Sequence, residues 1–430
     1  MSTVILGGGI IGNAISYYLS TNQPEGEVHI IEQSTELFSA ASGYAAGFLA
    51  KDWFAPSLAP LGALSFDLHT ELAAEKDGKK NWGFMKGTAF NLDTVPRQKQ
   101  SAPQADDWIH TGTSRAETAA GSHDLSAFEW PEWLTKQKDG NLEKISQEGS
   151  VAQVDPLRLC HHLMNSATSR GVKLHHPAKA TAVVKDANGT ITGVNIVRLD
   201  SKSESIIPCT NLVLSTGPWT PQVFKNLFPS SSISLDISPL AGYSLVVRSP
   251  RYTLEHERNV HGGQSHAVFT EHPPSCGFSP EIFLREGGEI YIAGLNSTTM
   301  NLPSCAEDRR RLFDPQEMQK LKDVAVRLMG GLAKDREDAT DETTNVNDLE
   351  ILREGLCFRP VGSTGVPTIG KIDNPSLGGG TKASPSGGVF IAAGHGPWGI
   401  SLSLGTGKII SEMIKKQELS VDVRGLEVKK

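Results

Sequence analysis

The chain lacks the features that mark several common classes of protein. Its five cysteines, Cys160, Cys209, Cys276, Cys305 and Cys357, are scattered and form no C-x-x-C pair. This spacing argues against a disulfide framework and a zinc ribbon, and it indicates reduced thiols. No apolar run approaches the length of a membrane-spanning helix, and no basic region precedes the apolar start MSTVILGGGIIG. We therefore expect a cytoplasmic protein without a transmembrane segment, and a peripheral location at an organelle stays open.

An excess of positive charge is also missing. The 41 lysines and arginines are outnumbered by 48 aspartates and glutamates, which gives a formal charge of −7. Neither nucleic acid nor an anionic membrane would be attracted to such a chain, so we predict no nucleic-acid partner. A length of 430 residues predicts two domains or one interrupted domain.

One cluster of metal-ligating residue types, Cys160-His161-His162, lies in a predicted helix. Asp155 is placed as its N-cap, Pro156 as its first residue and Gly171 as its stop. Adjacent residues on a helix point about 100° apart, so these three side chains do not converge. We predict no metal site.

The first thirty-odd residues carry the strongest motif. The apolar run TVIL is followed by G-x-G-x-x-G through Gly7, Gly9 and Gly12, then by a helical pattern and the second apolar run VHII. Glu32 follows that run, at the spacing of an acid that binds a ribose. Glycines let the backbone approach a pyrophosphate, and the helix N-terminus favours its charge. We predict dinucleotide binding by this unit, with further contacts from Ile10, Ile11 and Gln33.

The motif leaves the choice between NAD and FAD open, although Glu32 disfavours NADP because it would repel a 2′-phosphate. The small-residue run SAASGYAAGFLA at positions 39–50 allows two interpretations. Its backbone could pass close to a bulky cofactor, or it could form a helix packed on the sheet.

Taken together, GGGIIG, IEQ and SAASGYAAGFL resemble the D-amino-acid oxidase, glycine oxidase and sarcosine oxidase superfamily of FAD-dependent amine oxidases. The resemblance implies that the small-residue run lies beneath the flavin and its pyrophosphate. It then assigns FAD contacts to Ser42, Ala46, Gly47 and Leu49.

The resemblance continues through the middle of the chain. VDPLRLCHH resembles the family's Asp-Pro helix, and the strand that follows it implies an FAD contact at Ala180, before a hairpin at Asn188-Gly189. The turn in NLVLSTGPWTPQVF implies contacts from Thr216, Gly217 and Trp219. A core aromatic is the alternative for Trp219. Residues 239–248 and 281–294 alternate as antiparallel strands, while 96–148 are polar and irregular and 335–348 are acidic.

Near the C-terminus, CFRP, GVPTIGKI and AAGHGPWGI are most similar to a sparsely characterised fungal and plant branch of the superfamily. GVFIAAGH reads as a buried strand. After it, Gly394 and Gly396 would let a helix N-terminus point at the flavin and stabilise negative charge on the reduced ring. The same stretch adds Trp398, Gly399 and Ile400 to the predicted cofactor contacts. The segment 374–388 reads as a solvated loop.

The implied fold is α/β. It joins a discontinuous Rossmann-like FAD-binding domain of the GR2 type to an α+β substrate domain built on a large antiparallel or mixed sheet. We place the FAD-binding domain at residues 1–80, 150–228 and 355–430, and the substrate or cap domain at 81–149 and 229–354.

The implied reaction transfers a hydride equivalent from a C–H bond beside nitrogen to the flavin. Arg359 stands where the superfamily often binds a substrate carboxylate, and guanidinium pairs with carboxylate through two parallel hydrogen bonds. An arginine in a salt bridge at the sheet edge is the alternative. Glycine-oxidase-like members carry a further arginine in the final loop. Here Gly396-Pro397-Trp398 stands there, which points to a secondary amine or a bulkier, flatter ligand against Trp398.

Three further residues are candidates for the site. His395 is either an acid, base or donor to the flavin or a structural histidine, and Tyr243 is predicted to line the substrate cavity. Cys357 aligns with the cysteine that sarcosine-oxidase-type members link to FAD, although a buried cysteine is commonly an apolar filler. The following arginine and proline favour non-covalent FAD.

We therefore predict an FAD-dependent oxidoreductase acting on a small-molecule amine or amino acid, with dioxygen or another electron acceptor. An oxidase is favoured over a dehydrogenase. The alternative is an FAD-bound protein with a mainly assembly or intracellular-trafficking role and little turnover, which the missing second arginine and the polar insert favour.

Overall fold

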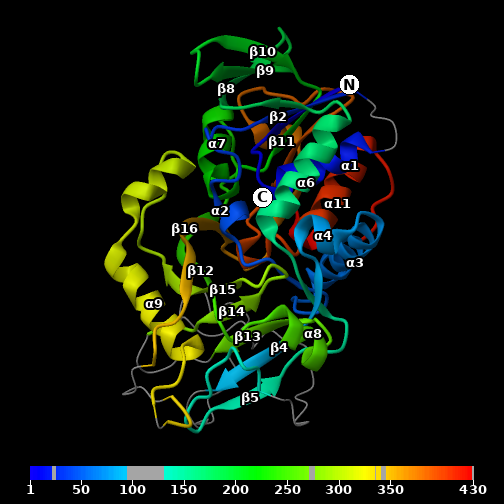
Figure 1. The fold of residues 1–430 in the computed structure, drawn as a ribbon. Coiled ribbons are helices and arrows are strands. Elements are labelled where there is room, and N and C mark those ends of the chain that lie inside the picture. Colours follow the sequence, from blue (N-terminus) through cyan, green and yellow to red (C-terminus); the bar gives the residue numbers. More distant parts are fainter. Residues whose placement is uncertain (22–25, 94–129, 271–276, 335, 340–344, 429–430) are drawn as a thin grey trace.

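The structure is a computed structural model that describes residues 1–21, 26–93, 130–270, 277–334, 336–339 and 345–428. The described residues form a mixed α/β fold with one largely parallel sheet, one large mixed sheet and one small antiparallel sheet (Figure 1). This architecture confirms the predicted fold class. Most of the predicted polar insert at 96–148, and part of the acidic stretch at 335–348, lie outside the described residues.

The predicted strand–helix–strand unit is the centre of a six-stranded sheet. In spatial order the sheet contains β17 (Thr368–Ile372), β18 (Gly388–Ala393), β11 (Asn211–Leu214), β1 (Ser2–Leu6), β2 (Glu27–Ile31) and β7 (Lys173–His175). All neighbours are parallel except the β17–β18 pair. Helix α1 (Ile10–Ser20) connects β1 to β2. The sheet therefore combines strands from the start, the middle and the end of the chain.

Alternation along β1 shows that both faces of this sheet are buried. Ile5 belongs to the core formed with the helices, whereas Val4 and Leu6 belong to the core on the opposite face. One face carries α1, α3 (Ala59–Glu75), α6 (Pro156–Ser169) and α11 (Ser403–Lys415). The other carries α7 (Thr220–Leu227) and the small sheet of β8 (Ala178–Lys185), β9 (Ile191–Arg198) and β10 (Glu204–Pro208).

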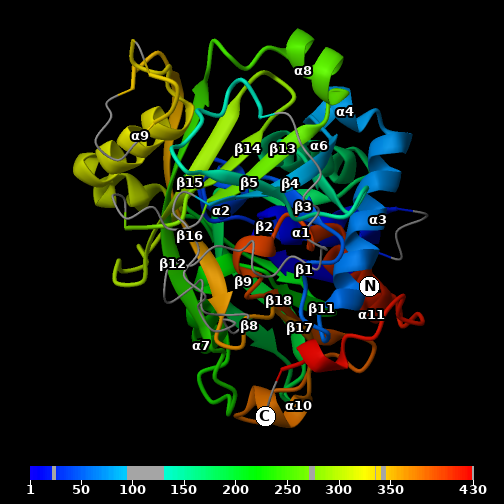
Figure 2. The same ribbon diagram turned by 90° about the horizontal axis from the view of Figure 1, so that it is seen from below.

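The large sheet has nine strands and lies beside the parallel sheet (Figure 2). Its main path runs β16 (Glu350–Gly362), β12 (Ile237–Arg248), β15 (Ile290–Ser297), β14 (Glu281–Leu284), β13 (Ser265–Thr270), β4 (Met85–Asp93), β6 (Val151–Gln153) and β3 (Phe48–Ala50), with β5 (Asn141–Lys144) beside β4. The β13–β4 pair is parallel and the others are antiparallel. Helix α9 (Pro315–Met329) packs on one face.

The predicted domain boundaries do not coincide with the division between the two sheets. Strands β3 and β6 belong to the large sheet although their residues fall in the ranges predicted for the FAD-binding domain, and β16 continues across the predicted boundary at 355. The domain boundaries therefore remain a prediction. The remaining described helices are short: α2 (Ala41–Tyr44), α4 (Gly78–Trp82), α8 (Leu254–His261), α10 (Asn374–Leu377), η2 (Gly217–Trp219), η3 (Ala306–Leu312), η4 (Gly396–Trp398) and η5 (Arg424–Leu426).

Several local predictions can be compared directly with the structure. The Asp155 side chain accepts a hydrogen bond from Arg158 N at 3.0 Å and caps α6, and β8 and β9 form the hairpin predicted at Asn188-Gly189. The helix expected directly after Gly396 instead begins at Ser403, because the 3₁₀ turn η4 comes first. The predicted loop at 374–388 contains α10, whose Leu377 is buried. Among the described helices, none has the length and apolar character needed to cross a membrane.

Candidate cofactor and substrate cavity

A cavity of about 670 Å³ lies where the two large sheets meet. Its walls come from the loop after β1, the end of β2, the start of β8, the loop after β11, strands β14 to β16, and the loop after β18. Of the residues predicted to form the site, these line the cavity: Gly7, Gly9, Ile10, Ile11, Glu32, Gln33, Ser42, Ala46, Ala180, Thr216, Gly217, Trp219, Cys357, Arg359, His395, Gly396, Gly399 and Ile400.

At one end, the Glu32 carboxylate is held by backbone groups. Gly8 N donates to Glu32 Oε2 at 2.7 Å, and Ser34 N donates to Glu32 Oε1 at 2.8 Å. Each carboxylate oxygen retains a lone pair for a further donor. Glu32 thus faces the cavity in a fixed orientation suited to accepting hydrogen bonds from hydroxyl groups.

Two glycines of the glycine-rich loop, Gly7 and Gly12, lie where a side chain would collide with neighbouring backbone. A Cβ atom on Gly12 would lie 2.0 Å from Gly7 O, and one on Gly7, which has φ +100°, would lie 2.5 Å from Ser215 O. Gly12 does not line the cavity, and its place is the contact between α1 and β1. Ser42 Oγ accepts from Ile10 N at 2.9 Å, which places its hydroxyl at the start of α1.

The small-residue run at positions 39–50 lies beside the cavity. It contains the short helix α2, and its residues Ala40, Ala41, Ser42, Ala45 and Ala46 also line the cavity. Side chains of the large sheet hold its carbonyl groups. Tyr291 Oη donates to Tyr44 O at 3.0 Å, Arg285 Nη2 to Ala45 O at 3.0 Å, and Arg353 Nη1 to Gly43 O at 3.1 Å.

At the other end of the cavity lies Arg359 on β16. Its Nη1 donates to Asn296 Oδ1 at 2.7 Å, and no ion pair with a carboxylate is recorded for it among the described residues. A Cβ atom on Gly242 of β12 would lie 2.4 Å from Arg359 Nη1, so glycine leaves the space that the guanidinium crosses. The cavity lining at this end also includes Glu281 of β14 and Tyr291 of β15. Burial raises the pKa of Tyr291, so its hydroxyl is protonated at neutral pH.

Cys357 and His395 also line this cavity, and both are buried. Burial raises the pKa of the Cys357 thiol, while it lowers the pKa of His395 to about 3. His395 Nε2 lies 3.1 Å from Thr406 Oγ1 of α11. The neutral, hydrogen-bonded imidazole favours the structural alternative for His395 over a cationic acid.

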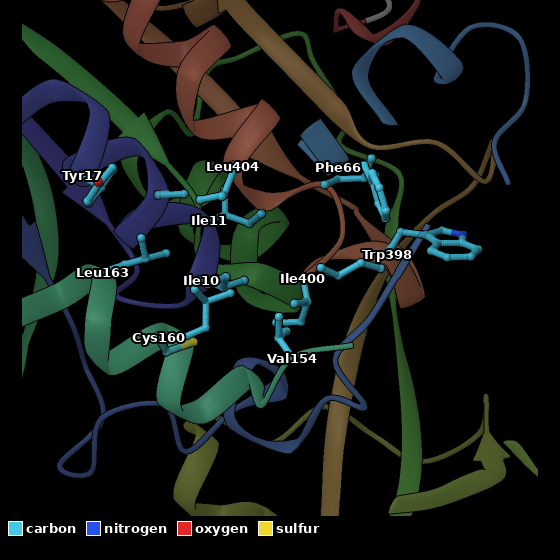
Figure 3. Close-up of a cluster of buried hydrophobic side chains, with 14 of the residues drawn as sticks. Ile10, Ile11, Tyr17, Phe66, Val154, Cys160, Leu163, Trp398, Ile400 and Leu404 are labelled. Carbon is cyan, nitrogen blue, oxygen red and sulfur yellow. The ribbon is translucent and has the colours of Figure 1, made fainter. Parts of the chain in front are cut away.

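Two predicted site residues point elsewhere. Trp398 does not line the cavity, because its ring packs against Phe54 at 5.0 Å between centroids and belongs to the buried cluster drawn in Figure 3. The geometry thus gives no support to a flat ligand against Trp398. Tyr243 lies on the face of β12 that packs on α9, and its Oη accepts from Asp314 N at 2.9 Å. It therefore anchors the start of α9.

Three other residues that were predicted to contact the cofactor lie behind the residues that line the cavity. Gly47 has φ +94° and allows close approach to Val154, Leu49 is buried in the core, and Gly394 has φ +82° at the end of β18. None of the three is a lining residue. They shape the backbone that carries the lining residues.

Residues 303–307, the closing strap, were not identified from the sequence. Trp219 Nε1 donates to Pro303 O at 2.7 Å, and the Glu307 carboxylate accepts from Thr35 N, Thr35 Oγ1 and Glu36 N. Ser304, Cys305 and Ala306 line the cavity. The strap thus joins the segment after β15 to the loop after β2.

Sequence reasoning also missed Tyr291 and Asn296. Tyr291 lies in the predicted strand 281–294, but alternation does not tell which face of a strand meets the cavity. Asn296 lies just beyond the predicted end of that strand. A polar residue at a strand end was the available signal, and it is a weak one.

The described residues fit an FAD molecule. The cavity is continuous from Ala180 of the small sheet, past Glu32 and the glycine-rich loop, to Arg359 of the large sheet, as an extended dinucleotide requires. The collisions that a Cβ atom would meet at Gly7 and Gly12 mark a backbone packed closely beside this cavity. A volume of about 670 Å³ also suits a cofactor-sized ligand.

Comparison with known proteins agrees with this geometry. A family model described as DAO, FAD dependent oxidoreductase, matches residues 2–413. A Schizosaccharomyces pombe protein named as an oxidoreductase is 27% identical over 96% of this chain and 93% of its own length. Glycine oxidase of Geobacillus kaustophilus is 24% identical over 97% of this chain and 94% of its own.

Solved structures share the fold. The crystal structure of the Geobacillus kaustophilus glycine oxidase has a TM-score of 0.67 and 20% identity, covering 100% of this chain and 98% of that one. The iminodiacetate oxidase of Chelativorans sp. BNC1 has a TM-score of 0.67 and 15% identity, covering 99% of this chain and 98% of that one.

Proposed function

Because the chain belongs to the DAO family of FAD-dependent oxidoreductases and is related to amino-acid oxidases, we propose that it oxidises the C–N bond of a secondary amine or an amino acid that carries a carboxylate. The observation that carries this proposal is Arg359. Its guanidinium lines the cavity, bonds to the neutral Asn296 amide, and has no carboxylate partner among the described residues.

The residues around Arg359 suit such a substrate. Arg359 would hold the carboxylate through paired hydrogen bonds, with Asn296 fixing the guanidinium plane. Glu281, whose backbone pairs with that of Ala293 in the same wall, would attract the cationic amine from solution. Bound FAD supplies the redox chemistry by accepting a hydride equivalent from the C–H bond beside the nitrogen. The closing strap and the apolar lining would limit water at that bond.

The named relatives support the choice of substrate class. One acts, by its name, on glycine, and another on iminodiacetate, which is a secondary amine with two carboxylates. Arg359 would hold one carboxylate, and the segment Gly396-Pro397-Trp398 supplies no second guanidinium. A secondary amine is therefore the better match for this chain. Dioxygen or another acceptor would remove the electrons, and we favour an oxidase.

We propose that FAD is bound without a covalent bond. Attachment through a cysteine sulfur requires a reactive thiolate, whereas burial keeps the Cys357 thiol protonated. Cys357 then acts as an apolar part of the cavity wall.

Anaerobic flavin reduction tests the proposed reaction. Purified flavin-loaded protein is mixed with a panel of secondary amines and amino acids, each paired with its decarboxylated analogue, and the visible flavin band is followed. We expect bleaching by carboxylated members and much slower bleaching by their analogues. If no amine or amino acid reduces the flavin while dithionite does, the oxidase proposal fails and the alternative of a flavin-bound assembly or trafficking protein gains support.

A further inference from the structure

Helix α8 brings three metal-ligating side chains together, away from the flavin cavity. One ligand atom each of His256, Glu257 and His261 lies within 4.8 Å of the others. None of the three lines the cavity. Glu257 and His261 are four residues apart and share a helix face. The His256 ring centroid lies 5.9 Å from that of His261, so the first turn of α8 brings it to the same side.

The Glu257 carboxylate is the unusual member of this group. Its side chain is 2% exposed, and neither oxygen has a hydrogen-bond donor among the described residues. His266 Nδ1 lies 3.9 Å from Glu257 Oε2. A buried carboxylate without donors is costly, since its lost hydration is not replaced. Such a group is expected where a cation compensates the charge.

From this geometry we propose that His256, Glu257 and His261 bind a divalent transition-metal ion of the Zn²⁺ class. Two imidazoles and one carboxylate are the borderline donors that zinc prefers, and they exclude a calcium or magnesium site built from oxygen alone. Zinc bonds of about 2.0–2.2 Å place tetrahedral ligands roughly 3.4 Å apart, so each side chain needs a shift of about 1 Å. A water would complete the coordination.

The site has an entry path and a structural effect. The His256 side chain is 23% exposed, which gives the ion access from solvent, while Glu257 closes the inner side. The Gly262–Gly263 turn links α8 to β13, whose second residue, His266, lies beside Glu257. Bound metal would therefore fix α8 against the start of β13 in the large sheet. This role does not depend on the proposed flavin chemistry.

Zinc binding to the full-length, flavin-loaded protein tests the proposal. Protein treated with EDTA is dialysed, zinc content is measured by plasma mass spectrometry, and the melting temperature is recorded with and without Zn²⁺. We expect one zinc per chain and a higher melting temperature with zinc, because an ion that binds the folded state alone stabilises it. Co²⁺ in the same site should give the visible absorption of a four-coordinate ion. Wild-type protein that binds no stoichiometric zinc would overturn the proposal.

The variant Glu257→Gln keeps the shape of the side chain and removes its charge. We expect its zinc dissociation constant to rise at least about 100-fold and its zinc-dependent melting shift to vanish. Glu255→Gln, at an exposed position on the same helix, is the matched control and should bind as wild type does. His261→Ala gives a second test if Glu257→Gln loses its flavin. Unchanged zinc affinity in either of the two ligand variants, when folded, would overturn the assignment.

Discussion

The two ends of the cavity are built in different ways. At the Glu32 end, the contacts come from one stretch of the chain near its start: a glycine-rich loop, the helix after it, and an acid whose oxygens are held by two backbone N–H groups. At the Arg359 end, they come from side chains on strands far apart in the sequence, with Asn296 and Arg359 joined across the large sheet. The geometry of the Glu32 end depends on close packing of the backbone. The geometry of the Arg359 end depends on which side chains meet across the strands.

This difference predicts which substitutions each end of the cavity tolerates. An added carbon atom at Gly7 or Gly12 meets backbone atoms, whereas a changed side chain at the Arg359 end leaves the strands in place. Cofactor retention should therefore be sensitive to backbone changes, and substrate choice to side chains. The following variants test that separation.

The largest effect is expected for Gly12→Ala. Its Cβ atom would lie 2.0 Å from Gly7 O, so α1 must move away from β1, at a cost of about 3 kcal/mol of folding free energy. We expect purified protein without flavin and with a lower melting temperature. Gly287→Ala is the control, because nothing lies within 4 Å of a Cβ atom there. Equal flavin content in both variants would show that the Glu32 end tolerates added atoms after all.

Arg359→Ala should leave flavin binding intact and weaken substrate binding. Loss of a charge-assisted pair is expected to lower kcat/KM for a carboxylated substrate by roughly 30- to 150-fold, which corresponds to about 2–3 kcal/mol. Steady-state kinetics with the decarboxylated analogue serve as the internal control and should not change. A variant that loses its flavin instead would mean that the two ends of the cavity are not separate.

Glu307→Gln probes the closing strap, which connects the segment after β15 to the loop after β2. The carboxylate accepts from Thr35 N, Thr35 Oγ1 and Glu36 N, and its loss should raise the FAD release rate about fivefold, which corresponds to about 1 kcal/mol. Flavin fluorescence after dilution measures that rate. Arg310→Gln is the control in the same helix, η3. It removes an exposed ion pair with Glu36 and should change little. Equal release rates in the two variants would remove the strap from cofactor retention.

The smallest effect is expected for Cys357→Ala. If the thiol is only part of the wall, flavin content stays near that of the parent, and acid precipitation of either protein leaves the flavin in solution. Flavin that stays with the precipitated parent but not with the variant would instead establish a covalent link.

The sequence predicted the Glu32 end because its interactions are local. G-x-G-x-x-G and the acid twenty residues beyond Gly12 fix one turn, and the structure confirms the strand–helix–strand unit that carries them. At the other end, pairing between distant strands decides which side chains meet. Tyr243 was predicted to face the cavity, yet the pleat of β12 turns it toward α9, and Trp398 packs in the aromatic core. The direction in which each of these two side chains points depends on its packing partners, and the sequence of one segment does not reveal them.

The order of strands in the parallel sheet also determines which parts of the chain must fold together before the cavity exists. Strand β18, which pairs with β11, and the loop from β18 to Ile400 complete a cavity that begins at the glycine-rich loop after β1. Until β18 has paired with β11, the glycine-rich loop and Arg359 have no common enclosure. Cofactor capture is therefore coupled to the pairing of β18, a strand remote in sequence from the glycine-rich loop.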